Sequence, residues 1–303
     1  MRHDDAPTHD HTPPAAPARR WRLRGAVLDL QRPQVMAICN VTPDSFSDGG
    51  EHYSVALACE FAQSAMHAGA TILDVGGEST RPGATPVPVD TELARVLPVI
   101  EAVRDRFPTL LVTIDTVKAA VARAALAAGA HAVNDVSGGR LDPAMFDVVA
   151  ESGAGMVVMH SRGDVRDMAS LVHTHYAGDV VTIVAGELAR QVELARRAGI
   201  ADDALVLDPG IGFAKTTAQS VALLRAIPRI TAIGFPVLVG ASRKRVIGEL
   251  TGVREPSMRA VGSAVAHAWA AAHGARIIRT HDVAATCDAL AVVMALAGHD
   301  EPS

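Results

Sequence analysis

Cysteine, aromatic residues and long hydrophobic runs are all scarce in this sequence. Its three cysteines, Cys39, Cys59 and Cys287, are odd in number and lack the spacing of a metal site, so we expect reduced thiols in a cytoplasmic protein. No apolar stretch reaches the ~20 residues that a transmembrane helix needs, so no membrane segment is expected. Cys39 has two interpretations, a reactive thiol beside a site or a small buried side chain.

The sequence also lacks a strong charge of either sign. The formal net charge is only −5, and the lysines and arginines are dispersed and form no basic stripe, so nucleic-acid binding is not expected. Apolar residues, in contrast, make up 49% of the 303 positions. Chains of this length can form two domains, but α/β barrels use the same length for a single core, which the high apolar fraction favours.

The first twenty residues differ in composition from the rest. Residues 1–20 are rich in Pro, Ala, Asp and His and have no apolar segment of the kind found in signal peptides. We therefore expect a disordered leader over 1–20, followed by a single domain over 21–303.

Apolar, β-branched runs recur along the rest of the chain at regular intervals. They predict eight strands: Val35–Cys39, Thr71–Val75, Leu110–Ile114, Ala132–Val133, Gly155–Met159, Ala204–Leu207, Pro236–Val239 and Arg276–Ile278.

Segments of helical period separate these runs. They predict helices over Ser54–Ala68, Val89–Arg106, Thr116–Ala128, Val180–Ala198, Ala218–Ala226, Arg259–Ala272 and Val283–Leu296. Several end in Ala-Gly or His-Gly, a typical helix stop. This alternation predicts a closed (β/α)₈ TIM barrel. A doubly wound open sheet is the alternative, but no Gly-rich dinucleotide fingerprint follows the first strand.

In a barrel, the residues that follow the strands form the active site. Here they are strongly polar: Asn40, Asp74, Asp115, Asn134, His160, Asp208, Ser242 to Arg245, Arg279 and His281. Any one of the acidic or amide residues has an alternative reading as a helix N-cap, Asp115 most clearly. Cations such as Lys244 and Arg279 would oppose the dipole at a helix N-terminus, so the set as a whole indicates a ligand site.

The set offers two kinds of chemistry. Asp208 suits the paired N–H groups of an amino-pyrimidinone, and Asn134 and Lys244 suit its acceptors. Asn40, Arg279 and His281 suit a phosphate or diphosphate, together with a hard cation if one is present. A heterocycle that carries a diphosphate fits both halves.

Seven motifs, in order, carry a resemblance to a known family. They are Asn40 to Gly50, Asp74 to Gly83, Ile114-Asp115-Thr116, Asn134 to Gly138, Asp208 to Phe213, Ser242-Arg243-Lys244 and Arg279 to Val283. In this order they resemble the dihydropteroate synthases, the folate-pathway enzymes that sulfonamides target. The resemblance covers nearly the whole barrel, about residues 35–283. The sequence around Gly212 and Gly240 is similar to that of actinobacterial members.

The resemblance implies a pterin-binding TIM barrel with a transferase activity. In that family (7,8-dihydropterin-6-yl)methyl diphosphate condenses with p-aminobenzoate to give 7,8-dihydropteroate and diphosphate, with Mg²⁺ assisting. The family pattern places the pterin against Asp115, Asn134, Asp208 and Lys244, with Asp74 and Phe213 also among the substrate-binding residues. It assigns Mg²⁺ and diphosphate to Asn40, Arg279 and His281, with Asn40 as the metal ligand. Catalysis is then expected from Asn40, Lys244, Arg279 and His281.

The same resemblance implies two mobile loops and a homodimer. Thr80, Arg81 and Pro82 would move in with Phe46 to complete the p-aminobenzoate pocket. The alanine-rich helices over 259–272 and 283–296 are candidates for the contact between subunits.

Some positions differ from the residues that are common in this family. His160 is followed by Ser161-Arg162-Gly163-Asp164, so it has two interpretations, a ligand contact or a buried or capping histidine. Arg245 replaces a common serine and either binds the p-aminobenzoate carboxylate or faces solvent. Two other function classes remain alternatives: a pterin barrel that transfers a methyl group to a corrinoid protein, and a non-catalytic pterin-binding paralogue.

Overall fold

Eight parallel strands form the centre of the molecule, as the sequence predicts. The computed structural model describes residues 19–42, 50–79 and 85–298. The sheet order is β8-β7-β6-β5-β4-β3-β10-β9, so neighbours in sequence are neighbours in space. The strands are β3 (Gln34–Asn40), β4 (Ile72–Gly76), β5 (Leu111–Asp115), β6 (Ala132–Asp135), β7 (Gly155–Met159), β8 (Leu205–Asp208), β9 (Leu238–Val239) and β10 (Ile277–Thr280).

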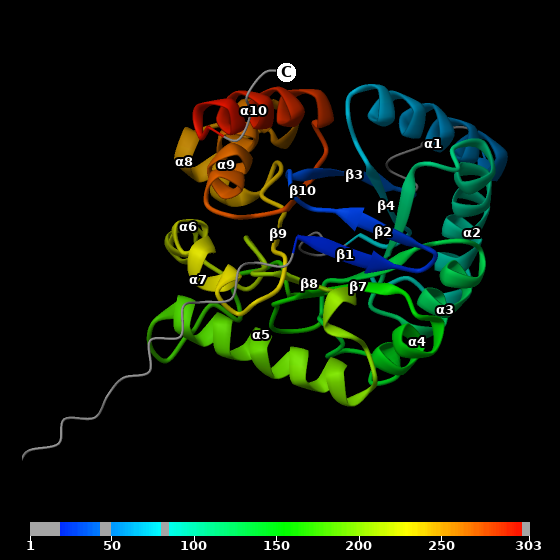
Figure 1. The fold of residues 1–303 in the computed structure, drawn as a ribbon, viewed down its shortest axis with the longest axis horizontal. Coiled ribbons are helices and arrows are strands. Elements are labelled where there is room, and N and C mark those ends of the chain that lie inside the picture. The colour runs from blue at the N-terminus through cyan, green and yellow to red at the C-terminus, as the bar shows by residue number, and fades with distance from the viewer. Residues whose placement is uncertain (1–18, 43–49, 80–84, 299–303) are drawn as a thin grey trace, which may run out of the picture.

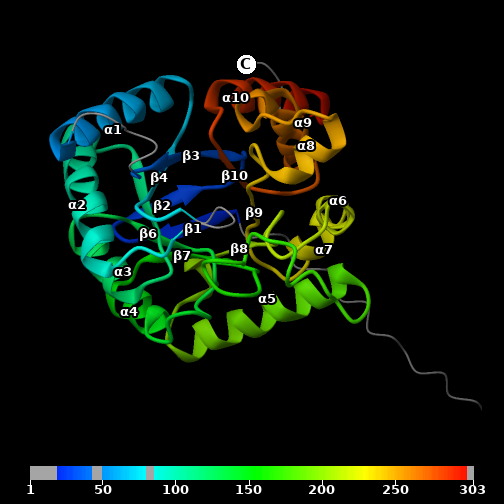
Figure 2. The ribbon, with the colours of Figure 1, turned by 180° about the vertical axis from the view of Figure 1, so that it is seen from behind.

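The two ends of this sheet meet and close the barrel. Val237, just before β9, forms a parallel bridge with Leu207 of β8, and the Leu207 N–H donates to the Pro236 carbonyl at 2.9 Å. Figures 1 and 2 show the strands enclosed by a ring of helices. The barrel prediction is confirmed, and the open doubly wound alternative is wrong.

Ten helices surround the strands in the described part of the chain. They are α1 (Gly50–His67), α2 (Val89–Arg106), α3 (Ala119–Ala127), α4 (Met145–Ser152), α5 (Val180–Arg197), α6 (Thr217–Arg225), α7 (Ile227–Thr231), α8 (Arg245–Thr251), α9 (Ala260–Ala272) and α10 (Val283–Leu296). The seven predicted helices are present with shifts at some ends, whereas the short α4, α7 and α8 were not predicted. All three are too short to give a clear helical period.

Local signals set several helix ends. The Thr216 hydroxyl accepts from the Gln219 N–H at the start of α6, and the Gln219 side chain accepts in return from the Thr216 N–H. The Asp179 carboxylate caps α5 by accepting from the Thr182 N–H. Gly199, after α5, adopts a φ of +96°, a conformation that an L residue rarely takes, which explains the Ala-Gly helix stop.

A hairpin that the sequence reading did not anticipate covers the amino-terminal end of the barrel. Strands β1 (Arg20–Leu23) and β2 (Ala26–Asp29) pair antiparallel and cross the near end of the barrel in Figure 1. Trp21 is fully buried, and its indole N–H donates to the Ala204 carbonyl at 2.9 Å. The hairpin starts at Arg20; residues 1–18 of the expected leader lie outside the described residues.

Above this hairpin the barrel interior is layered. One apolar residue from each strand packs against Trp21 and Leu23 of the hairpin: Met36, Ile72, Leu111, Ala132, Val157, Val206, Leu238 and Ile277. Because side chains alternate along a strand, residues two positions further point into the same interior. On β4 and β10 these are Asp74 and Arg279, so the core becomes polar toward the carboxyl ends of the strands.

Candidate active site

Strand register places three of the predicted residues, Asn40, Asp115 and Asn134, near one another at the barrel mouth. Asn40 pairs with Gly76, Gly76 with Asp115, and Asp115 with Asn134. A Cβ added at Gly76 would lie 3.4 Å from the Asp115 Cβ and 3.7 Å from the Asn40 Oδ1. Gly76 therefore leaves a gap between the Asn40 amide and the Asp115 carboxylate.

Asp74 lies one layer deeper, fully buried, and collects three donors. It accepts from the Thr113 hydroxyl at 2.5 Å, from the Asn134 amide at 2.8 Å and from Arg279 Nε at 2.6 Å. A buried carboxylate is tolerated only when its lone pairs are occupied, and these three bonds supply that. Asp74 thus fixes the positions of Asn134 and Arg279.

Arg279 bridges two carboxylates. Besides its contact with Asp74, its Nη2 donates to Asp115 Oδ2 at 2.6 Å. Burial raises the pKa of Asp115 to about 7, although Arg279 opposes that rise. Asp115 does not cap a helix, because the N-cap of α3 is Lys118. Its carboxylate faces the site, as the ligand-site reading predicts.

Asp208 and Lys244 occupy the opposite wall. Asp208, at the end of β8, is buried and accepts from the Gly210 N–H at 2.7 Å. Lys244 Nζ donates to the Ile211 carbonyl at 2.7 Å and lies 4.5 Å from the centre of the Phe213 ring. Burial raises the pKa of Asp208 and lowers that of Lys244 to about 8, while the Coulomb attraction between the two opposes both shifts.

His281 follows β10 and is held by Ser242. Its backbone N–H donates to the Ser242 hydroxyl at 3.1 Å, and the same hydroxyl lies 3.0 Å from Nδ1 of its ring. Next to them, an ion pair between Arg243 and Asp282 ties the loop after β9 to the loop after β10. The loop segments that carry Lys244 and His281 are thereby fixed relative to each other.

The two predicted mobile loops fall mostly outside the described residues. Phe46, Thr80, Arg81 and Pro82 all lie there. The described stem of the second loop is anchored, since Glu78 accepts from the Val87 N–H at 2.6 Å and from Lys118 Nζ at 3.0 Å.

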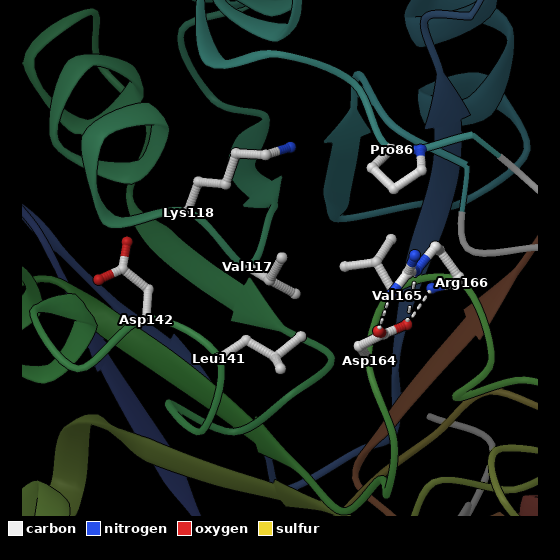
Figure 3. Close-up of a pocket in the computed structure, with 8 residues that line it drawn as sticks. All are labelled: Pro86, Val117, Lys118, Leu141, Asp142, Asp164, Val165 and Arg166. Carbon is white, nitrogen blue, oxygen red and sulfur yellow. Dashed lines mark hydrogen bonds and ion pairs between the residues drawn. The ribbon is translucent and has the colours of Figure 1, made fainter.

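A cavity of about 400 Å³ opens at the rim, among the loops that follow β4 to β7 (Figure 3). Its apolar lining includes Val117, Leu141 and Val165, which also belong to the apolar cluster around Phe213. None of the predicted substrate-binding residues that the structure describes lines it. The cavity therefore lies beside the polar residues of the barrel mouth.

The structure gives the surroundings of three residues that have two interpretations each. His160 is buried, with Nε2 2.7 Å from Glu187 and Nδ1 3.0 Å from Lys215, which supports the buried-histidine reading. Arg245 donates to the Lys215 carbonyl at 2.8 Å and lies 3.5 Å from Glu249, so it is tied to the protein surface. Cys39 is buried, and burial raises its thiol pKa to about 12, which favours the small buried side chain.

Sequence reasoning missed one residue, Lys215. It lies two residues after the Asp208 to Phe213 motif, is fully buried, and contacts both Phe213 and His160. The available signal was a lysine two residues after that Gly-rich motif and ahead of the predicted helix at 218–226.

The donor set near Asn40 fits a magnesium ion that takes most of its ligands from substrate and water. Mg²⁺ sites commonly use one or two protein oxygens together with phosphate oxygens. Among the described residues no group of three or more His, Cys, Asp or Glu forms a metal cluster, so an all-protein cage is not built there. The amide oxygen of Asn40, beside Gly76, is a suitable single ligand.

Comparison with known proteins gives the same picture. Residues 36–281 match the family described as pterin binding enzyme. A dihydropteroate synthase of Mycobacterium leprae is 46% identical over 274 residues, which cover 88% of this chain and 94% of that protein.

Solved structures agree. Xanthomonas albilineans dihydropteroate synthase with 4-aminobenzoic acid is 48% identical, with a TM-score of 0.86 over 94% of this chain and 99% of that one. The same enzyme in complex with 7,8-dihydropteroate is 45% identical, with a TM-score of 0.83 over 93% and 100%. The chain therefore belongs to the pterin-binding enzymes, within the dihydropteroate synthase family.

Proposed function

We propose that this chain condenses (7,8-dihydropterin-6-yl)methyl diphosphate with p-aminobenzoate, giving 7,8-dihydropteroate and diphosphate. The observation that carries the proposal is the pairing of two subsites in one barrel mouth. Asp208 and Lys244 form one wall, and Arg279 and His281 supply cationic and hydrogen-bonding groups next to it.

The first subsite suits the pterin ring. One carboxylate oxygen of Asp208 accepts from the Gly210 N–H, and the second oxygen is suited to N–H groups of the pterin ring. Asn134 is held through its amide nitrogen by Asp74, which fixes the direction of its carbonyl oxygen. Phe213, under Lys244, offers an apolar face for stacking.

The second subsite suits the leaving diphosphate. A guanidinium has five N–H donors. Within the described part of the chain, Arg279 donates one to Asp74 and one to Asp115, so further donors remain for an anion. Negative charge grows on the diphosphate as the carbon–oxygen bond breaks, and fixed cations there lower the barrier. We assign this role to Arg279 and His281.

Asn40 is the proposed ligand of Mg²⁺. When bound, the ion supplies charge neutralisation to the diphosphate oxygens. Asn40 contributes position, because strand pairing with β4 and the space at Gly76 set where its amide oxygen lies.

The reaction needs no covalent enzyme nucleophile. Loss of diphosphate leaves a methylene cation conjugated to the pterin, and the arylamine nitrogen of p-aminobenzoate forms the new carbon–nitrogen bond and then releases a proton. Water would compete for this cation, so closure of the loops that carry Phe46 and Thr80 to Pro82 is proposed to exclude it.

A homodimer is also proposed. Helices α9 and α10 lie side by side (Figure 1) and expose Val261, Val265, Trp269, Val292 and Leu296. Exposed apolar patches of this kind mark association surfaces. A second copy of the chain can cover the patch by two-fold symmetry.

The proposed location is the cytoplasm. The three cysteines are free thiols, and two of them are buried. In the described part of the chain, no helix has the length and apolar character required to cross a bilayer.

The activity is tested by measuring diphosphate release from the pterin substrate with Mg²⁺, with and without p-aminobenzoate, with dihydropteroate detected by mass. We expect equal amounts of both products, only when the arylamine is present. Arg279→Ala should lower kcat by roughly 10²–10³-fold, as removal of an oxyanion donor does. Tight pterin binding without product would instead support a non-catalytic paralogue.

A further inference from the structure

Lys215 is a buried cation that the reaction as described does not use. Within residues 19–42, 50–79 and 85–298 it is the only lysine or arginine that is completely buried. Burial lowers its pKa to about 7, and the Coulomb attraction of Asp208 opposes that change. Buried ionisable groups of this kind are concentrated at functional sites.

His160 orients the Lys215 ammonium. Lys215 Nζ donates to the Phe213 carbonyl at 2.9 Å and lies 3.0 Å from His160 Nδ1. An ammonium can only donate, so Nδ1 accepts and the ring proton is on Nε2. That proton is donated to Glu187 at 2.7 Å. Burial lowers the pKa of His160 to about 4, which keeps the ring neutral.

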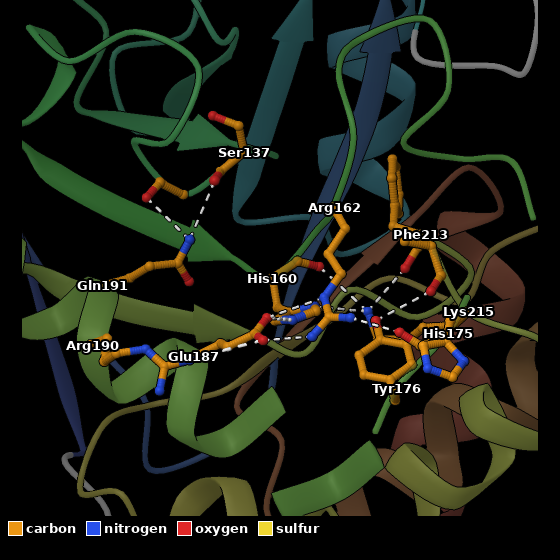
Figure 4. A network of polar contacts seen from close by, with 12 residues as sticks. Ser137, His160, Arg162, His175, Tyr176, Glu187, Arg190, Gln191, Phe213 and Lys215 are labelled. Atoms are coloured by element: carbon orange, nitrogen blue, oxygen red, sulfur yellow. Dashed lines mark hydrogen bonds and ion pairs between the residues drawn. The ribbon is translucent and has the colours of Figure 1, made fainter. Parts of the chain in front are cut away.

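Further contacts, through Arg162 and Tyr176, connect Glu187 to the loop after β8. Its carboxylate accepts from Arg162 at 2.5 Å, and the Arg162 guanidinium lies 4.1 Å from the centre of the Tyr176 ring. The Tyr176 hydroxyl donates to the Ala214 carbonyl at 3.1 Å. Figure 4 shows these side chains converging on Lys215 and Phe213.

The loop that these groups hold carries two predicted substrate-binding residues, Asp208 and Phe213. Ala214 has a φ of +50°, a left-handed conformation that is strained for an L residue. Lys215 binds the Phe213 carbonyl, while Lys244 binds the Ile211 carbonyl. The two lysines thus fix the same loop at two different carbonyls.

Lys215 also lies close to the Asp208 turn. A Cβ added at Gly210 would be 3.3 Å from Lys215 Nζ, and the Gly210 N–H is the donor to Asp208. The positive charge of Lys215 lowers the pKa of Asp208 and so opposes the effect of burial. An ionised Asp208 is the form that accepts two N–H groups.

We propose that Lys215, aligned by His160 and Glu187, is a positioning residue for the pterin subsite, which fixes the loop from Asp208 to Phe213 and supports the ionised Asp208 carboxylate. This inference rests on the proposed pterin subsite at Asp208. It predicts that Lys215 affects pterin binding selectively and leaves the use of p-aminobenzoate unchanged.

The test is Lys215→Met, which keeps the length of the side chain and removes its charge. Binding of 6-hydroxymethylpterin is measured at equilibrium by fluorescence, and KM and kcat are measured for both substrates. We expect the pterin Kd and the KM of the pterin substrate to rise about 10–100-fold, the effect of losing a bond to a charged group. The KM of p-aminobenzoate and kcat should stay near the wild-type values.

Glu187→Gln is the second variant and should weaken pterin binding in the same direction but less. Arg190→Ala is the matched control, because Arg190 is 72% exposed and lies 3.8 Å from the same carboxylate. It should bind the pterin as the wild type does. If Lys215→Met fails to fold, Glu187→Gln decides: an unchanged pterin Kd in that variant overturns the inference.

Asp208→Asn separates this inference from the subsite on which it rests. If Asp208→Asn loses pterin binding and Lys215→Met does not, the subsite stands and the role of Lys215 is refuted. If both bind the pterin normally, the proposed subsite itself is wrong. An equal loss of affinity for both substrates in Lys215→Met would show a general structural role and would also overturn the inference.

Discussion

Arg279, on the last barrel strand, is bound by Asp74, on the second. Nε of the arginine lies 2.6 Å from Oδ2 of the aspartate, although 205 residues separate them in the sequence. Asp74 is fully buried, and it also holds Asn134. One carboxylate therefore sets the position of a proposed diphosphate ligand and of a proposed pterin ligand.

Asp74→Ala should destabilise the fold strongly. Removing it leaves the Thr113 hydroxyl, the Asn134 amide and part of the Arg279 charge without a partner, and breaking a buried pair in this way costs about 3–5 kcal/mol. Urea unfolding measures the change. Arg123→Ala is the control: its ion pair with Glu151 is exposed on both sides and should contribute less than about 1 kcal/mol. Equal effects of the two variants would contradict the role of Asp74.

The pH dependence of kcat/KM for the pterin substrate should be bell-shaped. Below about pH 7 Asp115 binds a proton and loses its charge. As the pH rises through about 7 to 8, Lys215 and then Lys244 lose their protons and charge. Asp115→Asn should remove the acidic limb at a lower maximum, and steady-state rates from pH 5 to pH 10 would show this. An acidic limb that persists unchanged in Asp115→Asn would assign that limb to another group.

Asp115 should also make stability depend on pH. Its pKa is about 7 in the folded protein and near 3.8 when unfolded, so between these values the folded state binds more protons. Stability from this group is therefore present at low pH and lost as the pH rises toward 7, with a slope of up to about 1.4 kcal/mol per pH unit. Unfolding of the wild type and of Asp115→Asn, compared at pH 5 and pH 7, isolates this contribution. A difference between them that does not change with pH would refute it.

The amino-terminal hairpin should contribute to stability and not to chemistry. Trp21→Ala removes a fully buried indole and is expected to cost about 3–5 kcal/mol of unfolding free energy. The kcat of the folded fraction should not change, because the hairpin lies at the end of the barrel opposite the site. Val27→Ala, at an exposed position of β2, is the matched control and should stay within about 0.5 kcal/mol. A similar loss in both variants would mean that the hairpin is not part of the core.

The apolar face of α9 and α10 should control oligomeric state. Val261 and Val265 are 79% and 66% exposed and lie one turn apart, so replacing both with Glu puts two charges into the proposed interface. Sedimentation analysis should show a dimer for the wild type and a monomer for the double variant. Val172→Glu, equally exposed but on the loop after β7, should leave the dimer intact. A monomeric wild type, or a double variant that remains dimeric, would reject this interface.

Much of the fold could be predicted from the sequence because its signals are local. The strand at 155–159 is a continuous apolar run, and the helix at 180–197 has an amphipathic period and ends before a glycine. The hairpin at 20–29 has no comparable signal. Its strands have four residues each, β1 includes two arginines, and both strands are stabilised by the barrel end that they cover.

The candidate site divides in the same way. Position after a strand identified Asp115, Asn134, Asp208 and Arg279, because the barrel brings strand ends together whatever their distance in sequence. It gave no sign that Asp74 would lie one layer deeper and bind both Asn134 and Arg279. All five residues of β4 are buried, so neither hydropathy nor alternation shows which side chains face inward.

The sequence by itself determined the order of strands and helices, the closed barrel and the polar character of its mouth, because these depend on periodicity, chain-breaking residues and the position of polar groups after strands. Only the tertiary structure decided that Arg279 is shared by Asp74 and Asp115, and that Lys215 points inward to His160 and Phe213. These contacts depend on strand register and on a left-handed backbone at Ala214. Both are set by packing between segments that are distant in the chain.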